Sequence, residues 1–284
     1  MPQEQIINNL GLTTENGIYK SGAVLFFAKN PETFFQHIGI RCILFKGNTK
    51  RYILDDKLFT GNLVSQYENA NIHIQSKLET RYEIESQGFL PRKEILEIPE
   101  IAIKESLINA LSHRDYYVQG AIIHVEIFDN RVEITNPGGL VPQIKEYEFG
   151  KKSFSRNSLI FDLFQRMDLV EKVGTGIPRM NKAMKDAGLF EPEYSTKGFF
   201  TVKLYRPIRF SKWISNLEIE ISQNQERILS AISENNKVTY KKLGTITNLG
   251  QTAIETNIKK LKDLKLLERI GDKKTGYWEI NTRI

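Results

Sequence analysis

The sequence has few of the features that mark secreted or membrane proteins. Cys42 is the only cysteine, so no internal disulfide can form, and it is expected to be a small buried residue rather than a catalytic thiol. No apolar run approaches the about 20 residues that span a bilayer. The start, MPQEQIINNL, lacks the basic and then apolar order of a signal peptide. These absences favour a cytoplasmic protein.

The sequence also lacks the phosphate-binding loop of a helicase motor. Such a motor requires the pattern G-x-x-x-x-G-K-[ST], and the one candidate is Gly150-Lys151 in the segment FGKKS. Lys145 stands where the first glycine of the pattern belongs, and no clear strand precedes the segment. The chain is therefore not expected to contain a helicase engine of that class.

Length and charge indicate a globular protein with a basic end. At one domain per roughly 150 residues, the 284 residues suggest about two domains. The net charge is +6, and from Ser222 onward 12 Lys/Arg stand against 7 Asp/Glu, so five of the six excess charges lie in the last 63 residues. Such a module favours a polyanion as partner, with nucleic acid first, although a solvated lysine-rich surface would give the same excess.

The region over residues 1–95 shows no catalytic spacing. An apolar segment ends at the turn Asn30-Pro31, a strand-like stretch covers residues 40–47, and an amphipathic helix covers residues 61–78. We predict that this region is an α/β segment linking to the next domain.

The region over residues 96–207 is predicted to be an α+β domain. A helix runs to residue 113, a β-hairpin turns at Asp129-Asn130, two further helices follow, and a strand closes the region before Pro207.

The region over residues 222–284 is predicted to hold three helices and a β-hairpin. Thr239 opens the second helix, and the third, over residues 251–265, places isoleucine and leucine inward at helical spacing. A tight turn between the last two helices, followed by a hairpin with a basic tip, is typical of a winged helix-turn-helix.

The first helix of the middle region carries the first candidate site. Glu105 and Asn109 are four positions apart and share a helix face. A carboxylate beside an amide oxygen suits a hard cation such as Mg²⁺, and the carboxylate could orient a water toward a phosphoryl group. The same spacing also occurs on solvated helices. His113, Arg114 and Asp115 lie past this face and are expected to fix the helix end.

Two glycine clusters follow in the same region. Gly138 and Gly139 come after a strand, where missing side chains let a ligand approach the backbone. Gly174, Thr175 and Gly176 precede a helix whose free N–H groups and dipole can hold phosphate. Each cluster alone is also typical of a plain turn or helix entry. In one domain with the acid and amide helix, they predict a nucleotide site.

This order of motifs resembles the ATPase superfamily of DNA gyrase, heat-shock chaperones, histidine kinases and MutL. The resemblance implies a histidine-kinase/gyrase-type ATPase sandwich with ATP and Mg²⁺ as ligands. Glu105 would be the general base and Asn109 the Mg²⁺ ligand. Residues 136–139 would form the adenine-side box and residues 174–176 the phosphate-side box. Residues 141–172 would be the lid over the nucleotide.

The chain resembles one bacterial and archaeal subfamily more closely still, through the segments NALSHRDY, VEITNPGGL, SRN and VEKVGTGIPRM. Its members are identified as the C-terminal domain of RecG-like ATP-dependent DNA helicases or transcriptional regulators. The resemblance is strongest over residues 99–205, and LFFAKNP and FKG extend it into the first region. In that subfamily an AlbA-type, Schlafen-like domain commonly lies upstream and a winged helix often follows. The upstream domain is absent from these residues, as expected if the sequence is part of a longer protein.

The chain departs from the superfamily pattern in its adenine-side box. The superfamily carries an aspartate there, and the equivalent position here is Thr135 or Asn136, neither of which is acidic. An amide oxygen can accept one hydrogen bond, but without charge assistance. We therefore expect ATP binding with weakened base recognition, and hydrolysis is the less expected activity.

The predicted recognition helix and wing supply the candidate DNA contacts. Glutamine and threonine near a helix start could read base edges, and lysines would meet phosphates or the minor groove. The candidates are Gln251, Thr252, Thr256, Lys259 and Lys260 on the helix and Lys273 and Lys274 at the wing tip. The alternative is a winged helix used for protein contacts.

These features predict a DNA-binding transcriptional regulator, expected to be a homodimer, whose ATPase-like domain binds ATP and controls the winged helix. Two alternatives stay open. The first is a DNA-dependent ATPase that is accessory to a DNA transaction. The second is a degenerate scaffold in which the ATPase fold no longer binds nucleotide.

Overall fold

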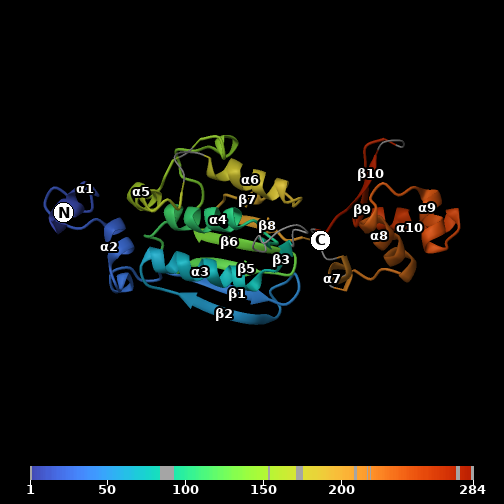
Figure 1. The fold of residues 1–284 in the computed structure, drawn as a ribbon, viewed down its shortest axis with the longest axis horizontal. Coiled ribbons are helices and arrows are strands. Elements are labelled where there is room, and N and C mark those ends of the chain that lie inside the picture. Colours follow the sequence, from blue (N-terminus) through green and yellow to red (C-terminus); the bar gives the residue numbers. More distant parts are fainter. Residues whose placement is uncertain are drawn as a thin grey trace, which may run out of the picture. The chain divides into compact units, whose positions relative to one another are not determined.

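The computed structural model describes residues 2–83, 93–152, 154–170, 175–207, 210–215, 217, 219–272 and 276–282. They fall into two compact units, Met1–Pro207 and Ile208–Ile284, which are described separately (Figure 1). The boundary predicted near residue 95 lies inside the first unit.

A six-stranded mixed sheet forms the centre of the first unit, in the order β2-β1-β5-β6-β8-β7. Only the β1–β5 pair of this sheet is parallel. The predicted hairpin is confirmed as β5–β6, whereas the entry of β1 and β2 into the same sheet was not foreseen. The strands are β1 (Ile40–Phe45), β2 (Ile53–Phe59), β5 (Ile123–Ile127), β6 (Arg131–Pro137), β7 (Glu193–Ser195) and β8 (Phe199–Tyr205).

Helices α3 and α4 pack on this sheet, and α4 also contacts α5 and α6 (Figure 1). Among the described residues, no helix combines the length and apolarity needed to cross a bilayer. The helices are α1 (Gln3–Asn9), α2 (Ser21–Phe27), α3 (Leu63–Lys77), α4 (Glu100–His113), α5 (Ser158–Arg166) and α6 (Gly176–Asp186). Two 3₁₀ turns, η1 (Pro31–Thr33) and η2 (Glu146–Glu148), and a small hairpin of β3 (Thr80–Glu83) and β4 (Lys93–Leu96) complete the unit.

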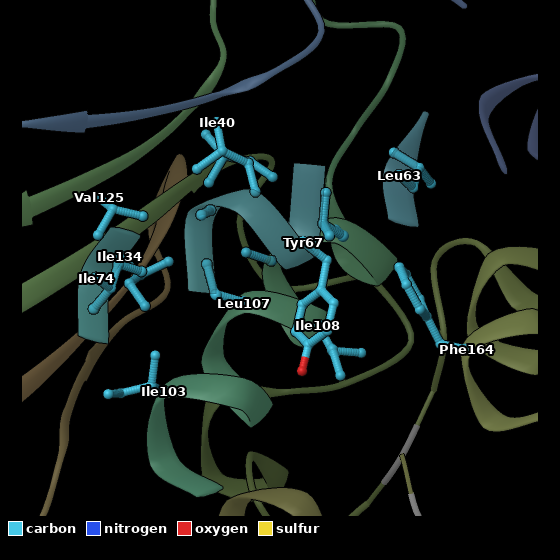
Figure 2. Packing of buried hydrophobic residues seen from close by; sticks show 14 of the residues in the cluster. Ile40, Leu63, Tyr67, Ile74, Ile103, Leu107, Ile108, Val125, Ile134 and Phe164 are labelled. Carbon is cyan, nitrogen blue, oxygen red and sulfur yellow. The ribbon is translucent and has the colours of Figure 1, made fainter. Parts of the chain in front are cut away.

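Alternation along the strands separates an apolar face from a polar one. Val125 and Ile134 are buried under the helices with Ile103 and Leu107 of α4 (Figure 2). Burying an aliphatic side chain of this size contributes about 1.5–3 kcal/mol, so α4 is firmly held against the sheet. Cys42 on β1 is also buried, as predicted, and burial raises its pKa to about 12.

The second unit contains the predicted helices and hairpin, with its own core around Trp278. As predicted, Thr239 opens a helix, and its hydroxyl accepts from the Lys242 N–H at 3.3 Å. The predicted wing-tip lysines, Lys273 and Lys274, lie outside the described residues. The elements are α7 (Phe210–Ser215), α8 (Gln223–Glu234), α9 (Tyr240–Thr247), α10 (Gln251–Asp263), β9 (Leu267–Ile270) and β10 (Tyr277–Ile280).

Candidate functional site

One pocket in the first unit collects most of the predicted nucleotide-site residues. Its volume is about 130 Å³, several times the roughly 10–15 Å³ that a single water requires. Three chain segments form its wall. Helix α4 supplies Glu105 and Asn109, the end of β6 with its following loop supplies Asn136, Gly138 and Gly139, and the start of α6 supplies Gly176. Thr175 is not part of this wall, and Gly174 lies outside the described residues.

The start of α6 lies directly against the acidic wall. A Cβ placed on Gly176 would lie 2.6 Å from Oε2 of Glu105 and 3.8 Å from Nδ2 of Asn109. Glu105 is only 2 % exposed, and its Oε1 accepts from the guanidinium of Arg179 on α6. Glycine at position 176 thus lets the carboxylate approach the first turn of the helix.

The glycines of the loop after β6 line the pocket and are also required for packing. Gly138 has a φ of +95°, and a Cβ on it would lie 3.0 Å from the Cβ of Asp115. A Cβ on Gly139 would lie 2.4 Å from the carbonyl oxygen of Thr196. Protein atoms occupy the space where side chains of these two residues would lie. A larger residue at either position would therefore clash with the protein itself.

The end of α4 is fixed as predicted for Arg114 and Asp115. Arg114 is 1 % exposed and donates through Nη2 to the carbonyls of His37 and Ala121, the latter at 2.8 Å. Burial lowers the pKa of this guanidinium. Asp115 pairs at 3.4 Å with Arg156, which also donates to the Gly139 carbonyl at 2.9 Å. The helix end thereby holds the glycine loop in place.

His113 is different, and the prediction that it lies past the site face is wrong. Spacings of four residues return to one side of a helix, so His113 joins Glu105 and Asn109 on the pocket wall. Burial, with a smaller effect from the nearby Arg156 charge, lowers the pKa of His113 to about 4. The imidazole is therefore neutral at pH 7 and can both donate and accept a hydrogen bond.

The depressed pKa of His113 predicts a loss of stability in acid. The unfolded chain binds the proton near pH 6.5 and the folded chain only near pH 4. The stabilisation is therefore present above pH 6.5 and disappears as the pH falls toward 4. Its full size is about 3 kcal/mol. Urea unfolding of wild type and His113→Asn at pH 7 and pH 4 should show the variant losing less stability. An equal loss in both proteins would contradict the assignment.

The structure distinguishes the two candidate positions of the adenine-side box. The hydroxyl of Thr135 lies 2.9 Å from that of Thr201 and does not line the pocket. Asn136 is 1 % exposed and lines it, and its Nδ2 makes a long contact of 3.4 Å with the Pro137 carbonyl. Of the two, Asn136 is therefore the residue that lines the pocket.

Several pocket residues were missed from the sequence. Phe149 and Tyr194 meet with ring centroids 5.1 Å apart, Phe200 lies 5.7 Å from Phe149, and all three line the pocket. Lys152 lines it as well and pairs with Glu148. The aromatic residues come from separate segments with no shared spacing. Arg179 was also missed. It does not line the pocket but pairs with Glu105, and its position three residues after Gly176 on one helix was visible in the sequence.

The pocket residues fit the ligands that the resemblance implies. Aromatic and aliphatic walls with one buried amide suit a nucleobase. The side-chain oxygen of Asn109 suits Mg²⁺, which prefers oxygen ligands and commonly keeps phosphate and water oxygens as well. No group of three or more His, Cys, Asp or Glu able to hold a metal occurs in the part of the chain that the structure describes.

On α10 of the second unit, all five predicted DNA-contact residues are exposed. Gln251 donates to the Glu255 carboxylate at 2.9 Å, and the Thr256 hydroxyl donates to the Thr252 carbonyl at 2.8 Å. Together with the exposed Lys259 and Lys260, these side chains cover the broad solvent-facing side of α10.

Comparison with known proteins gives one structural match to the whole chain and one family match to part of it. The crystal structure of the DIP2311 protein from Corynebacterium diphtheriae aligns with a TM-score of 0.62 and 20% identity, covering 100% of this chain and 58% of that one. At this identity the match shows a shared fold. No curated protein matches the chain. Residues 120–204 match the family model described as "Putative ATP-dependent DNA helicase recG C-terminal", so the chain contains a domain of that family.

Proposed function

We propose that the protein is a DNA-binding regulator whose first unit binds ATP with Mg²⁺ and whose second unit is a winged helix-turn-helix that binds DNA. The observation that carries the proposal is the convergence on one pocket. Four residues from three separate chain segments, Glu105, Asn109, Asn136 and Gly176, line it together. The family description names an ATP-dependent DNA helicase, which agrees with both ligands.

Each wall of the pocket would hold a different part of the nucleotide. Asn136 would meet the base beside the aromatic residues, and the start of α6 would lie toward the phosphates. Asn109 would supply an oxygen to Mg²⁺, which neutralises phosphate charge when bound. Lys152, which also lines the pocket, would add a positive charge near the phosphates.

The state of Glu105 favours holding ATP over hydrolysing it. A general base needs a carboxylate oxygen within hydrogen-bond reach of the attacking water. Here one oxygen is engaged by Arg179 and the other lies against Gly176. We therefore propose that binding of ATP in the pocket, rather than its hydrolysis, controls the winged helix. The alternative, a DNA-dependent ATPase, would require this carboxylate to be released.

The second unit would bind DNA through α10. The proposal is supported by the order of three helices and a hairpin and by the exposed polar side of α10, which includes Lys259 and Lys260. Glutamine and threonine would face base edges, and the lysines would face phosphates. A homodimer would present two such units to a two-fold symmetric site.

The nucleotide part is tested by calorimetric titration of Mg-ATP into wild type and Asn109→Ala. Wild type should bind, and the variant should bind at least about tenfold more weakly because it lacks the metal-ligand oxygen. Asn8→Ala, an exposed change on α1, serves as the matched control and should bind like wild type. Absence of binding to wild type at millimolar Mg-ATP would refute the nucleotide role.

A further inference from the structure

Strand β2 forms one edge of the six-stranded sheet and, among the described residues, pairs only with β1 (Figure 1). The outer side of an edge strand presents backbone N–H and C=O groups to which another strand can add. Three aliphatic side chains of this strand, Ile53, Leu54 and Leu58, are 58%, 61% and 56% exposed. Exposed aliphatic residues on a sheet edge favour addition of a further strand.

The two faces of β2 carry different side chains. On the face toward α3, Asp55 pairs at 2.6 Å with a lysine of that helix. Lys57 shares this face, because alternate residues of a strand point the same way. Asp56 points to the opposite face, where it pairs at 2.6 Å with an arginine of β1. Leu54 and Leu58 flank Asp56 at the same spacing, so they are its aliphatic neighbours on that face.

The sequence of β2 is complementary to itself when two copies run antiparallel. A two-fold axis along the sheet normal at Asp56 places Leu54 of one copy opposite Leu58 of the other. On the other face, the same axis places Asp55 opposite Lys57. Aliphatic residues therefore meet each other and acid meets base, each twice. Moving the axis to either neighbouring residue of Asp56 would instead place a leucine opposite an aspartate.

The axis brings the two Asp56 carboxylates opposite each other, and like charges in that arrangement oppose pairing. Arg41 of each copy compensates them, since its guanidinium donates to both carboxylate oxygens, at 2.9 and 2.6 Å. A β-bulge next to Leu54 interrupts the register of β2 with β1. The regular part of the strand, residues 54–58, is therefore the segment available for symmetric pairing.

We propose that β2 is the surface through which two copies of this chain associate, antiparallel about Asp56, so that their two sheets continue into one. The inference gives the expected homodimer an interface, which the proposed function leaves open. It involves only the first unit and no residue of the nucleotide pocket, so it stands or fails independently of ATP binding.

The first test is the molar mass of the full chain, measured by light scattering after gel filtration over a concentration series. Wild type should approach twice the 32.8 kDa of one chain. Leu54→Lys with Leu58→Lys should weaken association about thirtyfold or more, because lysines would then lie opposite lysines at the edge. Ile18→Lys with Ile246→Lys, two exposed positions outside β2, is the matched control and should associate like wild type.

Cysteine cross-linking tests the register without removing the interface. Asp56→Cys should form a disulfide-linked dimer under mild oxidation, because opposite residues of antiparallel strands have Cα atoms about 4.5–5.5 Å apart, within disulfide reach. Leu54→Cys alone should not link, since its two copies would lie roughly 14 Å apart along the strands. A mixture of the Leu54→Cys and Leu58→Cys proteins should link. Wild type, whose Cys42 is buried, should stay unlinked.

Three outcomes would overturn the inference. A wild type that stays monomeric over the whole series would mean that the charges and bulge of β2 protect this edge from pairing. A dimer that persists in the double lysine variant would place the interface elsewhere, as would equal weakening in the control. Linkage of Leu54→Cys alone, with none of Asp56→Cys, would contradict the antiparallel register about Asp56.

Discussion

Arg114→Met is expected to lower the free energy of unfolding by about 3 kcal/mol. The guanidinium is buried and donates to two carbonyls, those of His37 and Ala121, so it ties two loops to the end of α4. Methionine has a similar length but no hydrogen-bond donor. Each of the two carbonyls would lose its hydrogen bond to the guanidinium, which costs about 1–3 kcal/mol of stability per buried group. Removing a buried positive charge, which burial already disfavours, offsets part of this cost.

Urea unfolding of Arg114→Met and Arg114→Lys measures this effect. Lysine keeps one donor group and should fall between wild type and the methionine variant. Arg166→Met, an exposed change in the last turn of α5, should stay within about 0.5 kcal/mol of wild type. If Arg114→Met were as stable as this control, the helix-end role of Arg114 would be wrong.

Replacing Lys259 and Lys260 together by alanine should weaken DNA binding roughly 50-fold at 0.1 M salt. Both lysines are exposed near the end of α10, where the proposed docking places them against phosphates. The logarithm of affinity falls as the logarithm of salt concentration rises. Each phosphate that a lysine no longer neutralises makes this dependence less steep by about 0.9, so its magnitude should decrease by about 1.8. Titration of a fluorescent mixed-sequence duplex at several salt concentrations measures both quantities.

The matched control for this pair removes two lysines from a helix of the other unit. Lys182 and Lys185 on α6 are exposed and three positions apart, so Lys182→Ala with Lys185→Ala changes the net charge equally. The control should keep the wild-type slope. Equal weakening in the two double variants would mean that net charge, rather than α10, governs binding, and the winged-helix proposal would fail.

Local patterns predicted the elements of this protein well. The helix with Glu105 and Asn109 on one face, the hairpin at Asp129-Asn130 and the cap at Thr239 all depend on residues within a few positions of one another. Propensity, turn chemistry and capping act over that range, so a sequence displays them directly.

The features that could not be predicted from the sequence depend on contacts between distant segments. The parallel pairing of Ile40 with Ile123 draws the first region into the central sheet, and no local spacing records it. Glu105 meets Arg179 across 74 positions. The packing of Gly139 against Thr196 likewise becomes visible only when two loops are placed together.

The most direct test of the account is a crystal structure of the protein with Mg²⁺ and a non-hydrolysable ATP analogue. The account predicts nucleotide density in the pocket between Glu105, Gly139 and Gly176, with the base beside Asn136 and the metal at Asn109. Density at another site, or side chains filling this pocket at saturating analogue, would contradict it.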